Sequence, residues 1–393
     1  MQNRELTVQQ KEAVEKLRTL RVGALFMACG TGKTQTAVAL INGIDDADLL
    51  VWLCPCQTKD NLCHELTECG LKMKPEIIGI ESLISDRIFL ETKELLEKAN
   101  RAILICDESL KIKNLSAQRT NRILKLSKHA YYKLILNGTP VTKNVIDIYS
   151  QMEFLSPRIF NCTLRQFKLK YCVLAQKKKG SRVISEWVKR AENVDHLLSV
   201  IDPYVFSCDL KLSVEKEHIE KRFYLDEESE EAYYNLKAEM LQEIADMDSS
   251  EAGTTILGYM QRMQQAYCIS EEKFNLVEKI ADEKTIVFCK FIRSAEALKE
   301  RFPNLMVLTY GKNSIGLNLQ HMNKCIYFDK TFDYAFAEQS EYRIFRTGQQ
   351  DDCKYYHLTA EIGLEKIFDA CINKKIRLVQ YLKKKGKKVL EEL

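Results

Sequence analysis

The sequence predicts an α/β protein with two parallel-sheet lobes and a helical insertion between them. Short apolar runs alternate with helix-like patterns over residues 22–137, and the same alternation returns over residues 285–358. Continuous apolar runs such as Leu49 to Cys54 are typical of strands that are buried on both faces of a sheet. Residues 149–266 lack this alternation and contain longer helical patterns.

This organisation predicts four segments. We expect the first lobe over residues 1–155, an insertion with a basic hairpin and a linker over residues 156–270, and the second lobe over residues 271–372. Residues 373–393 form a basic tail. Of the 59 basic and 55 acidic residues in the chain, positions 374–393 hold eight and two, which leaves 51 and 53 for the rest. Such a tail can hold a phosphate backbone or can be a solvated helix end.

The composition is that of a soluble globular protein, with 46% apolar and 29% charged residues. No apolar run approaches the ~18 residues that a membrane span needs, and the N-terminus has no features of a signal peptide. The 14 cysteines form no C-x-x-C pair, so we interpret them as reduced thiols of a cytosolic protein. We expect a monomer in the cytoplasm, associated with the nucleoid, or in the host cytoplasm if a virus encodes it.

The first candidate site is a phosphate-binding loop from Met27 to Thr34. An apolar run leads into it, and a helix-like pattern begins at its end. In such a loop the backbone N–H groups face an anion, Lys33 reaches the β- and γ-phosphates and Thr34 holds Mg²⁺. The general pattern has Gly where this chain has Met27, and a chance Gly-Lys-Thr in a surface turn is the alternative. The loop predicts an ATP site with Mg²⁺, contacted by Gly30, Thr31, Gly32, Lys33 and Thr34.

Gln10 lies upstream of this loop in a helical pattern. Its amide has one donor group and one acceptor, which match the donor and acceptor edge of adenine. We therefore predict that Gln10 contacts the nucleotide, with an exposed helix glutamine as the alternative.

The second candidate site is the acidic pair Asp107 and Glu108, which follows an apolar run from Ala102 to Cys106. Hydrolysis of ATP requires a carboxylate that holds Mg²⁺, often through water, and a group that orients and deprotonates the attacking water. We assign the first role to Asp107 and the second to Glu108. A surface Asp-Glu pair is the alternative.

The third candidate site lies near the end of the chain, at Gln339, Arg343 and Arg346. Their spacing of i, i+4 and i+7 places them on one face of a predicted helix that extends to Gln349. Two guanidinium groups on one face repel each other, and the developing charge on a transferred γ-phosphate would offset this cost. We predict an arginine-finger role, with a solvated basic face as the alternative.

These motifs together resemble those of the SWI/SNF-type ATPases, which are double-stranded DNA translocases within helicase superfamily two. Residues Asp107 to Asn114 resemble the family's extended acidic box, with Leu110 in place of histidine and Lys111 in place of arginine. Residues 27–34 are similar to its phosphate loop, which also lacks the first Gly. Further similar segments are Gln10, Gly138-Thr139-Pro140 with Asn144, Gly316 to Leu319, and Gln339 to Gln349.

The middle of the chain resembles, more loosely, the annealing-type branch of this family. Phe167 and Tyr171 precede a lysine-rich turn at residues 177–182, and residues 183–188 have the pattern of a second hairpin strand. The hairpin tip can contact phosphates or can be a plain soluble turn. The second lobe has only a few residues between Leu298 and Met306, where the family has a further strand and helix.

The resemblance implies two RecA-like lobes that use ATP and Mg²⁺, with Gly316 as a further nucleotide contact. It also implies contacts to nucleic acid from strand-end loops, at Pro55, Gln57, Ser82, Lys113, Gly138, Thr139, Lys290 and Asn318. We predict an ATP-driven motor that translocates along or remodels double-stranded DNA, a minimal phage-like form serving DNA repair or replication. Single-stranded DNA is the second candidate substrate. A strand-separating helicase and an inactive nucleic-acid-binding scaffold are the alternatives.

Overall fold

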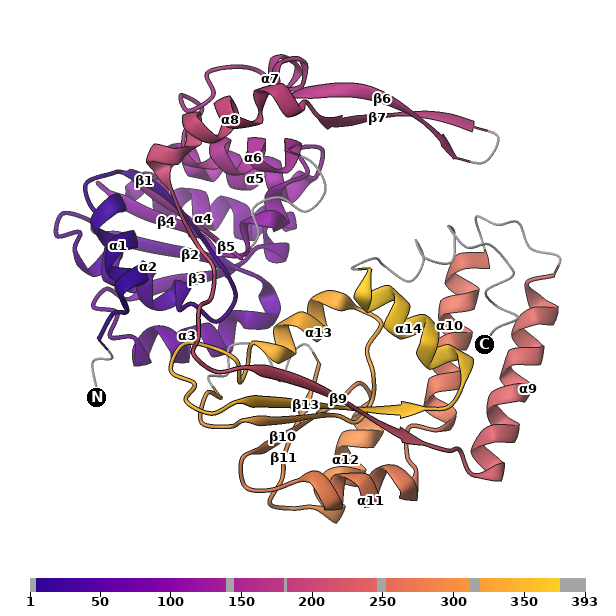
Figure 1. Cartoon of the computed structure of the whole chain (residues 1–393). Helices are drawn as coiled ribbons and strands as arrows, with labels where there is room; N and C mark the ends of the chain where they lie inside the picture. Colours follow the sequence, from indigo (N-terminus) through magenta and orange to yellow (C-terminus); the bar gives the residue numbers. More distant parts are fainter. Residues whose placement is uncertain (1–4, 139–144, 180–181, 246–251, 311–318, 375–393) are drawn as a thin grey trace. The chain divides into compact units, whose positions relative to one another are not determined.

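The computed structural model describes residues 5–138, 145–179, 182–245, 252–310 and 319–374 (Figure 1). The chain divides into two compact units, unit 1 over Met1–Lys211 and unit 2 over Leu212–Leu393. Each unit contains a parallel sheet with helices, which confirms the predicted α/β class. This division falls inside the expected insertion 156–270, and the finer division into four segments stays a prediction.

Unit 1 contains a six-stranded parallel sheet with the strand order β3-β2-β4-β5-β1-β8. Five of its strands come from the alternating region and the sixth closes the unit: β1 (Val22–Met27), β2 (Leu49–Cys54), β3 (Pro75–Gly79), β4 (Ala102–Cys106), β5 (Tyr132–Asn137) and β8 (Val205–Cys208). Because all of the strands are parallel, their carboxyl ends meet at one edge of the sheet. In parallel sheets this edge is where ligands bind.

Helices cover both faces of this sheet. The helices are α1 (Val8–Leu17), α2 (Lys33–Asn42), α3 (Lys59–Glu68), α4 (Asp86–Lys98), α5 (Gln118–Leu126), α6 (Ile146–Leu155), α7 (Leu164–Tyr171) and α8 (Val194–Ile201). Apolar side chains of α1, α2 and α3 form one core with the sheet, and those of α4 to α8 form another. Alternate residues of β2 enter opposite cores, Trp52 one and Leu53 the other, so the whole strand is apolar.

A two-stranded antiparallel ribbon projects from unit 1 beside α7 and α8 (Figure 1). Its strands are β6 (Cys172–Lys179) and β7 (Arg182–Lys189), which confirms the predicted hairpin. The base is fixed to the unit, because Arg190 N donates to Tyr171 O at 2.9 Å and Tyr171 is buried in the core.

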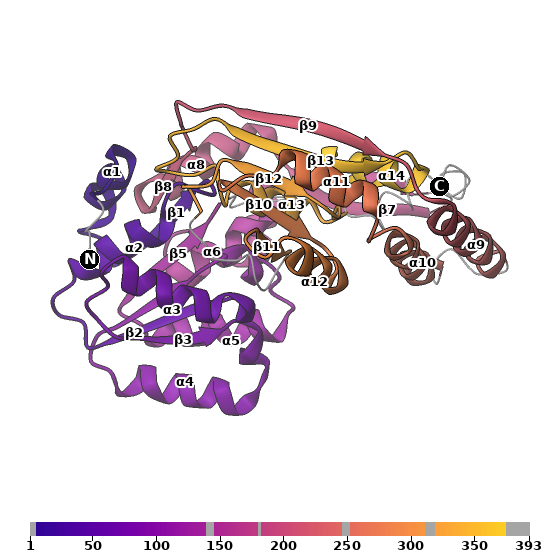
Figure 2. The same ribbon diagram turned by 90° about the horizontal axis from the view of Figure 1, so that it is seen from below.

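Unit 2 contains a five-stranded parallel sheet with the order β11-β10-β12-β13-β9. The strands are β9 (Lys216–Phe223), β10 (Thr285–Cys289), β11 (Met306–Thr309), β12 (Lys324–Tyr327) and β13 (Cys353–Ala360). The helices are α9 (Glu227–Glu243), α10 (Ala252–Ala266), α11 (Glu271–Ile280), α12 (Ile292–Arg301), α13 (Tyr334–Glu341) and α14 (Gly363–Asn373). A core lies on each face of the sheet, and Figure 2 shows β9 at its outer edge beside β13. Within the described ranges, no helix combines the length and apolarity that a membrane span requires.

Candidate active site

The predicted phosphate loop connects β1 to α2 in unit 1. Gly30 and Gly32 have positive φ angles of 82° and 81°, a conformation that L side chains adopt only with strain. Gly32 caps the start of α2, and a Cβ atom at this position would lie 2.2 Å from Gln10 Nε2. A larger residue would be strained at this φ and would displace Gln10. The backbone N–H groups at the start of α2 are the groups that would face a bound anion.

The side chain of Lys33 curls back onto this loop. Its Nζ donates to Met27 O at 3.0 Å and to Ala28 O at 3.4 Å, and Thr31 Oγ1 donates to the same Ala28 carbonyl at 2.7 Å. The ammonium group is therefore held by neutral carbonyls beside the end of β1. A phosphate oxygen would replace these contacts with charge-assisted hydrogen bonds.

Gln10 is buried, with 1% of its surface exposed, so the alternative of an exposed helix glutamine is wrong. Its Oε1 accepts from Thr7 N at 3.0 Å as part of the cap of α1, and its Nε2 donates to Thr31 O at 2.9 Å. The amide thus joins α1 to the phosphate loop. The predicted contact with adenine stays a prediction.

The acidic pair follows β4, which is separated from β1 by β5 alone in the sheet. Burial, reinforced by the charge of Glu108, raises the pKa of Asp107 to about 7, although the Lys33 ammonium acts in the opposite direction. Asp107 Oδ1 also accepts from Glu108 N at 2.8 Å. Glu108 itself has a positive φ of 49°, a conformation that is strained in a non-glycine residue and is often found at functional sites.

These groups suit a magnesium ion bound with a nucleotide. Mg²⁺ usually binds one or two carboxylates, keeps several waters and takes phosphate oxygens as further ligands. A dehydrated carboxylate with a raised pKa, as at Asp107, gains from a divalent cation beside it. Among the described residues no cluster of three or more His, Cys, Asp or Glu side chains fits a metal. With a nucleotide bound, the residues that would hold the ion are Asp107 and Thr34, the second residue of α2, together with phosphates and water.

The predicted nucleic-acid contacts of unit 1 lie on the same edge of the sheet. Pro55 and Gln57 follow β2, Ser82 follows β3 and Lys113 follows the acidic pair. Gly138 follows β5, where a Cβ atom would lie 3.5 Å from Cys29 Sγ of the phosphate loop. The predicted contact Thr139, with Pro140 and Asn144 of the same motif, lies outside the described residues.

In unit 2 the predicted contact Lys290 follows β10 and is directed into the unit. Its Nζ donates to Gln264 Oε1 at 2.6 Å and lies 4.2 Å from the ring centroid of Phe332. Burial lowers the pKa of Lys290 to about 8, against the influence of nearby carboxylates. Its role as a nucleic-acid contact stays a prediction. Gly316 and Asn318 lie outside the described residues.

The predicted helix through Gln349 is wrong beyond Glu341, where α13 ends. Gln339 lies on α13, whereas Arg343 and Arg346 lie in the turns that follow. The turns after α13 are held by groups outside the helix: Leu319 N donates to Arg343 O at 3.1 Å, and Gln349 Nε2 donates to Ile344 O at 3.1 Å. The buried side chain of Ile344 holds this segment against the core.

The sequence did not predict two further contacts around the acidic pair. Ser109 Oγ donates to Gln151 Oε1 of α6 at 2.6 Å, and both residues are fully buried. Lys111 Nζ donates to Glu81 Oε1 at 2.8 Å. Position 111 belongs to the acidic box, but no local pattern identifies Gln151 or Glu81, because both come from other elements.

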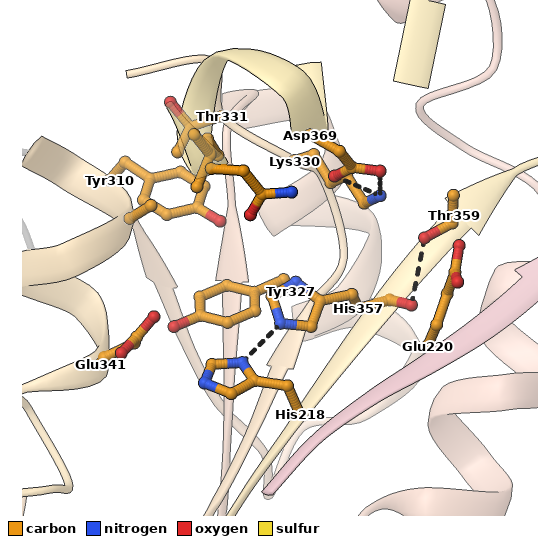
Figure 3. A pocket seen from close by; sticks show the side chains of 13 residues that line it. His218, Glu220, Tyr310, Tyr327, Lys330, Thr331, Glu341, His357, Thr359 and Asp369 are labelled. Carbon is orange, nitrogen blue, oxygen red and sulfur yellow. Dashed lines mark hydrogen bonds and ion pairs between the residues drawn. The ribbon is translucent and has the colours of Figure 1, made fainter. Parts of the chain in front are cut away.

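A separate cavity of about 420 Å³ lies on one face of the sheet of unit 2, beside α13 and α14 (Figure 3). His218 Nδ1 lies 3.0 Å from His357 Nε2 in its wall. Burial, with smaller effects of His218 and Lys330, lowers the pKa of His357 to about 3, so this imidazole is neutral at pH 7. Lys330 is paired with Asp369 at 2.9 Å. Of the part of the chain that the structure describes, no predicted site residue lines this cavity.

The comparison with known families identifies the class of protein. A sequence model described as "SNF2-related domain" matches residues 76–272, which is 197 of the 393 residues. The chain belongs to the SNF2-related family, and the resemblance to SWI/SNF-type ATPases of helicase superfamily two is confirmed. The matched region contains Asp107 and Glu108, whereas the phosphate loop precedes it.

Individual relatives are distant and much longer than the matched regions. The chain is 22% identical over 325 residues to the Zorya protein ZorD of Escherichia coli, covering 66% of this chain and 29% of that protein. It is 21% identical over 179 residues to a SWI/SNF-related, matrix-associated, actin-dependent regulator of chromatin (subfamily A, containing DEAD/H box 1) of Xenopus tropicalis. That match covers 44% of this chain and 17% of the relative.

Among solved structures, the SWI2/SNF2 ATPase core of Sulfolobus solfataricus in complex with double-stranded DNA is similar at 17% identity. The TM-score is 0.45, with 99% of this chain and 97% of that chain covered.

Proposed function

We propose that this protein is a motor that hydrolyses Mg²⁺-ATP to translocate along, or remodel, double-stranded DNA. The observation that carries the proposal is the meeting of a phosphate loop and an acidic pair at one edge of the sheet of unit 1. The Lys33 ammonium is close enough to Asp107 to lower the pKa of that carboxyl, against the larger effect of burial. Membership of the SNF2-related family supports the same chemistry.

In this proposal each site residue has one role. Lys33 binds the β- and γ-phosphates, Thr34 and Asp107 hold Mg²⁺, and Glu108 orients and deprotonates the attacking water. Arg343 and Arg346 of unit 2, aided by Gln339, stabilise the negative charge that develops on the γ-phosphate. The remaining nucleotide contacts come from the loop and its neighbours: Gln10, Gly30, Thr31, Gly32 and Gly316.

The proposed substrate is duplex DNA, held through its phosphates. The relative in Xenopus is named as a regulator of chromatin, which supports a duplex rather than a single strand. Contacts from strand-end loops to phosphate are indifferent to base sequence and weaken as salt rises. Proposed contacts are Pro55, Gln57, Ser82, Lys113, Gly138 and Thr139 in unit 1, and Lys290 and Asn318 in unit 2.

The test is ATP turnover by the full chain with no polymer, single-stranded DNA, duplex DNA and duplex RNA. We expect the largest stimulation by duplex DNA and no turnover by Lys33→Ala. Equal rates under all four conditions would contradict a motor. Binding of duplex DNA by the wild type and by Lys33→Ala alike, with no ATP turnover under any of the four conditions, would instead support a scaffold with an inactive ATPase.

The ribbon β6–β7 favours a second candidate, a strand-separating helicase. A projecting hairpin can act as a wedge between strands, and this one projects from the unit that holds the phosphate loop (Figure 1). Release of single strands from a forked duplex, lost when the ribbon is shortened, would favour this function over translocation alone.

A further inference from the structure

Three neighbouring strand ends of unit 1 are joined by one carboxylate. The strands β3, β2 and β4 are adjacent in the sheet, and Glu81, Cys56 and Lys111 follow their ends. Glu81 Oε1 accepts from Lys111 Nζ at 2.8 Å, and Glu81 Oε2 accepts from Cys56 N at 2.9 Å. Each oxygen thus serves a different loop.

The carboxylate is ionised in this environment. Partial burial disfavours the charge, but the hydrogen bonds from Lys111 and from Cys56 N prevail and lower the pKa of Glu81 to about 2. At pH 7 the group is therefore a permanent anion between an ammonium group and a backbone N–H. A glutamine in its place would keep the shape and one acceptor oxygen, but would lose the charge.

The loops around Glu81 are packed closely. Cys56 Sγ lies 3.2 Å from Ser82 Oγ, and a Cβ atom at Gly79 would lie 2.2 Å from that sulfur. Even the smallest side chain at Gly79 would therefore force the Cys56 side chain to move. The two loops are thus in direct contact beside Glu81.

The connection from Lys111 to the acidic pair is equally short. Lys111 lies in the short 3₁₀ helix Ser109–Ile112, directly after Glu108. Lys111 N donates to Glu108 O at 2.8 Å, and Ile112 is fully buried, which fixes this turn. A shift of the acidic pair on binding of Mg²⁺ and nucleotide would carry the Lys111 ammonium with it.

We propose that Glu81 is a positioning residue that couples the ATP site of unit 1 to its nucleic-acid loops. Cys56 lies between Pro55 and Gln57, and Ser82 follows Glu81 directly, so the carboxylate holds three of the proposed contacts to nucleic acid. The inference rests on the proposed function, because it concerns how that ATP site acts on duplex DNA. In this chain Lys111, in place of the arginine of related acidic boxes, supplies the cation.

The test measures the coupling itself. The dissociation constant for a labelled DNA duplex is determined with and without a non-hydrolysable ATP analogue, and the ratio of the two values reports the coupling. We expect a wild-type ratio at least about fivefold away from one. Glu81→Gln should bring the ratio to within about twofold of one, while ATP turnover without DNA changes less than about twofold.

Matched variants separate coupling from stability. Glu94→Gln removes a carboxylate from an ion pair of similar length in the same unit, Glu94 to Lys98 at 2.6 Å on α4, and should keep the wild-type ratio. Lys111→Arg should keep most of the coupling. Lys111→Met should bring the ratio as close to one as Glu81→Gln does. The double variant should give the same ratio as either single variant, since both remove the same ion pair.

The outcomes distinguish this inference from the function on which it rests. If the wild type neither binds duplex DNA nor hydrolyses ATP faster with it, the proposed function fails. If the wild type is coupled but Glu81→Gln shows the same ratio, the function stands and the role of Glu81 is wrong. An equal loss of coupling in Glu94→Gln would also overturn this role.

Discussion

The protonation of Asp107 makes the stability of the protein depend on pH. Its folded-state pKa of about 7 lies above the 3.8 of an ordinary aspartate, because burial and the charge of Glu108 disfavour the anion. Between these pH values the folded protein holds a proton that the unfolded chain has lost. Through this group, the free energy of unfolding therefore falls as pH rises from 3.8 to about 7, and is level above that range.

This sign gives a prediction for Asp107→Asn, which has a similar shape but no proton to lose. We expect the wild type to lose stability relative to the variant as pH rises from about 5 to 7, measured by urea unfolding without nucleotide. Since Mg²⁺ replaces the proton, the affinity of the wild type for Mg²⁺-ADP should increase over the same range. Parallel pH profiles of wild type and variant would contradict the raised pKa.

Gly32 gives a second prediction at this scale. Gly32→Ala places a Cβ atom at a positive φ and against Gln10 Nε2, so we expect a loss of about 1–2 kcal/mol in the free energy of unfolding and of most ATP affinity. Gly43→Ala, at the other end of α2, is the control: its nearest neighbour would be Leu40 O at 3.4 Å, and its φ is negative. Chemical denaturation and binding of a fluorescent ATP analogue measure both effects. Equal behaviour of the two variants would contradict the fitted loop.

At the scale of elements, the sequence predicted the apolar strands of both sheets but not the edge strands β8 and β9. Strands such as β2 and β4 are buried on both faces and are therefore continuously apolar. The edge strand β9 has the sequence KEHIEKRF, whose charges discourage pairing with another chain but also conceal the strand. The edge strand β8 has only four residues, and its register on β1 depends on contacts distant in sequence.

Contacts between residues distant in sequence also limit what could be predicted of the candidate site. The positions of Lys33 and Asp107 after apolar strands could be predicted, because each motif is contiguous with the strand that places it. The bond from Glu81 to Lys111 could not, since it joins the ends of β3 and β4 across a strand order that the sequence does not state. The end of α13 at Glu341 could not be predicted either, since the contacts that hold the following turns, such as Leu319 N on Arg343 O, come from residues distant in sequence.

The ribbon β6–β7 gives the prediction for an element. Replacing residues 175–186 with Asn-Gly joins Leu174 to Trp187, which already face each other, and removes Lys177, Lys178, Lys179 and Arg182. If the tip contacts phosphates, the slope of log affinity for duplex DNA against log salt should fall by about 3. A variant with these four residues changed to Gln should show the same decrease in slope. An unchanged slope in both variants would favour a plain soluble turn.

At the scale of the whole molecule, each unit has its own cores, and the proposed function assigns each unit part of the chemistry. Unit 1 carries the phosphate loop and the acidic pair, and unit 2 carries Arg343 and Arg346. We expect Arg343→Ala and Arg346→Ala to lower kcat at least ~100-fold, while the affinity for ATP changes less than about threefold. Arg293→Ala, an exposed arginine on α12, is the control. Normal turnover in either finger variant would contradict the division of roles.

The most direct test of the motor is displacement of a third strand from a DNA triplex by the full chain. With ATP, we expect release of the third strand while the two duplex strands stay paired, and no release with Lys33→Ala. Hydrolysis of ATP at the normal rate with the third strand still bound would contradict translocation along double-stranded DNA.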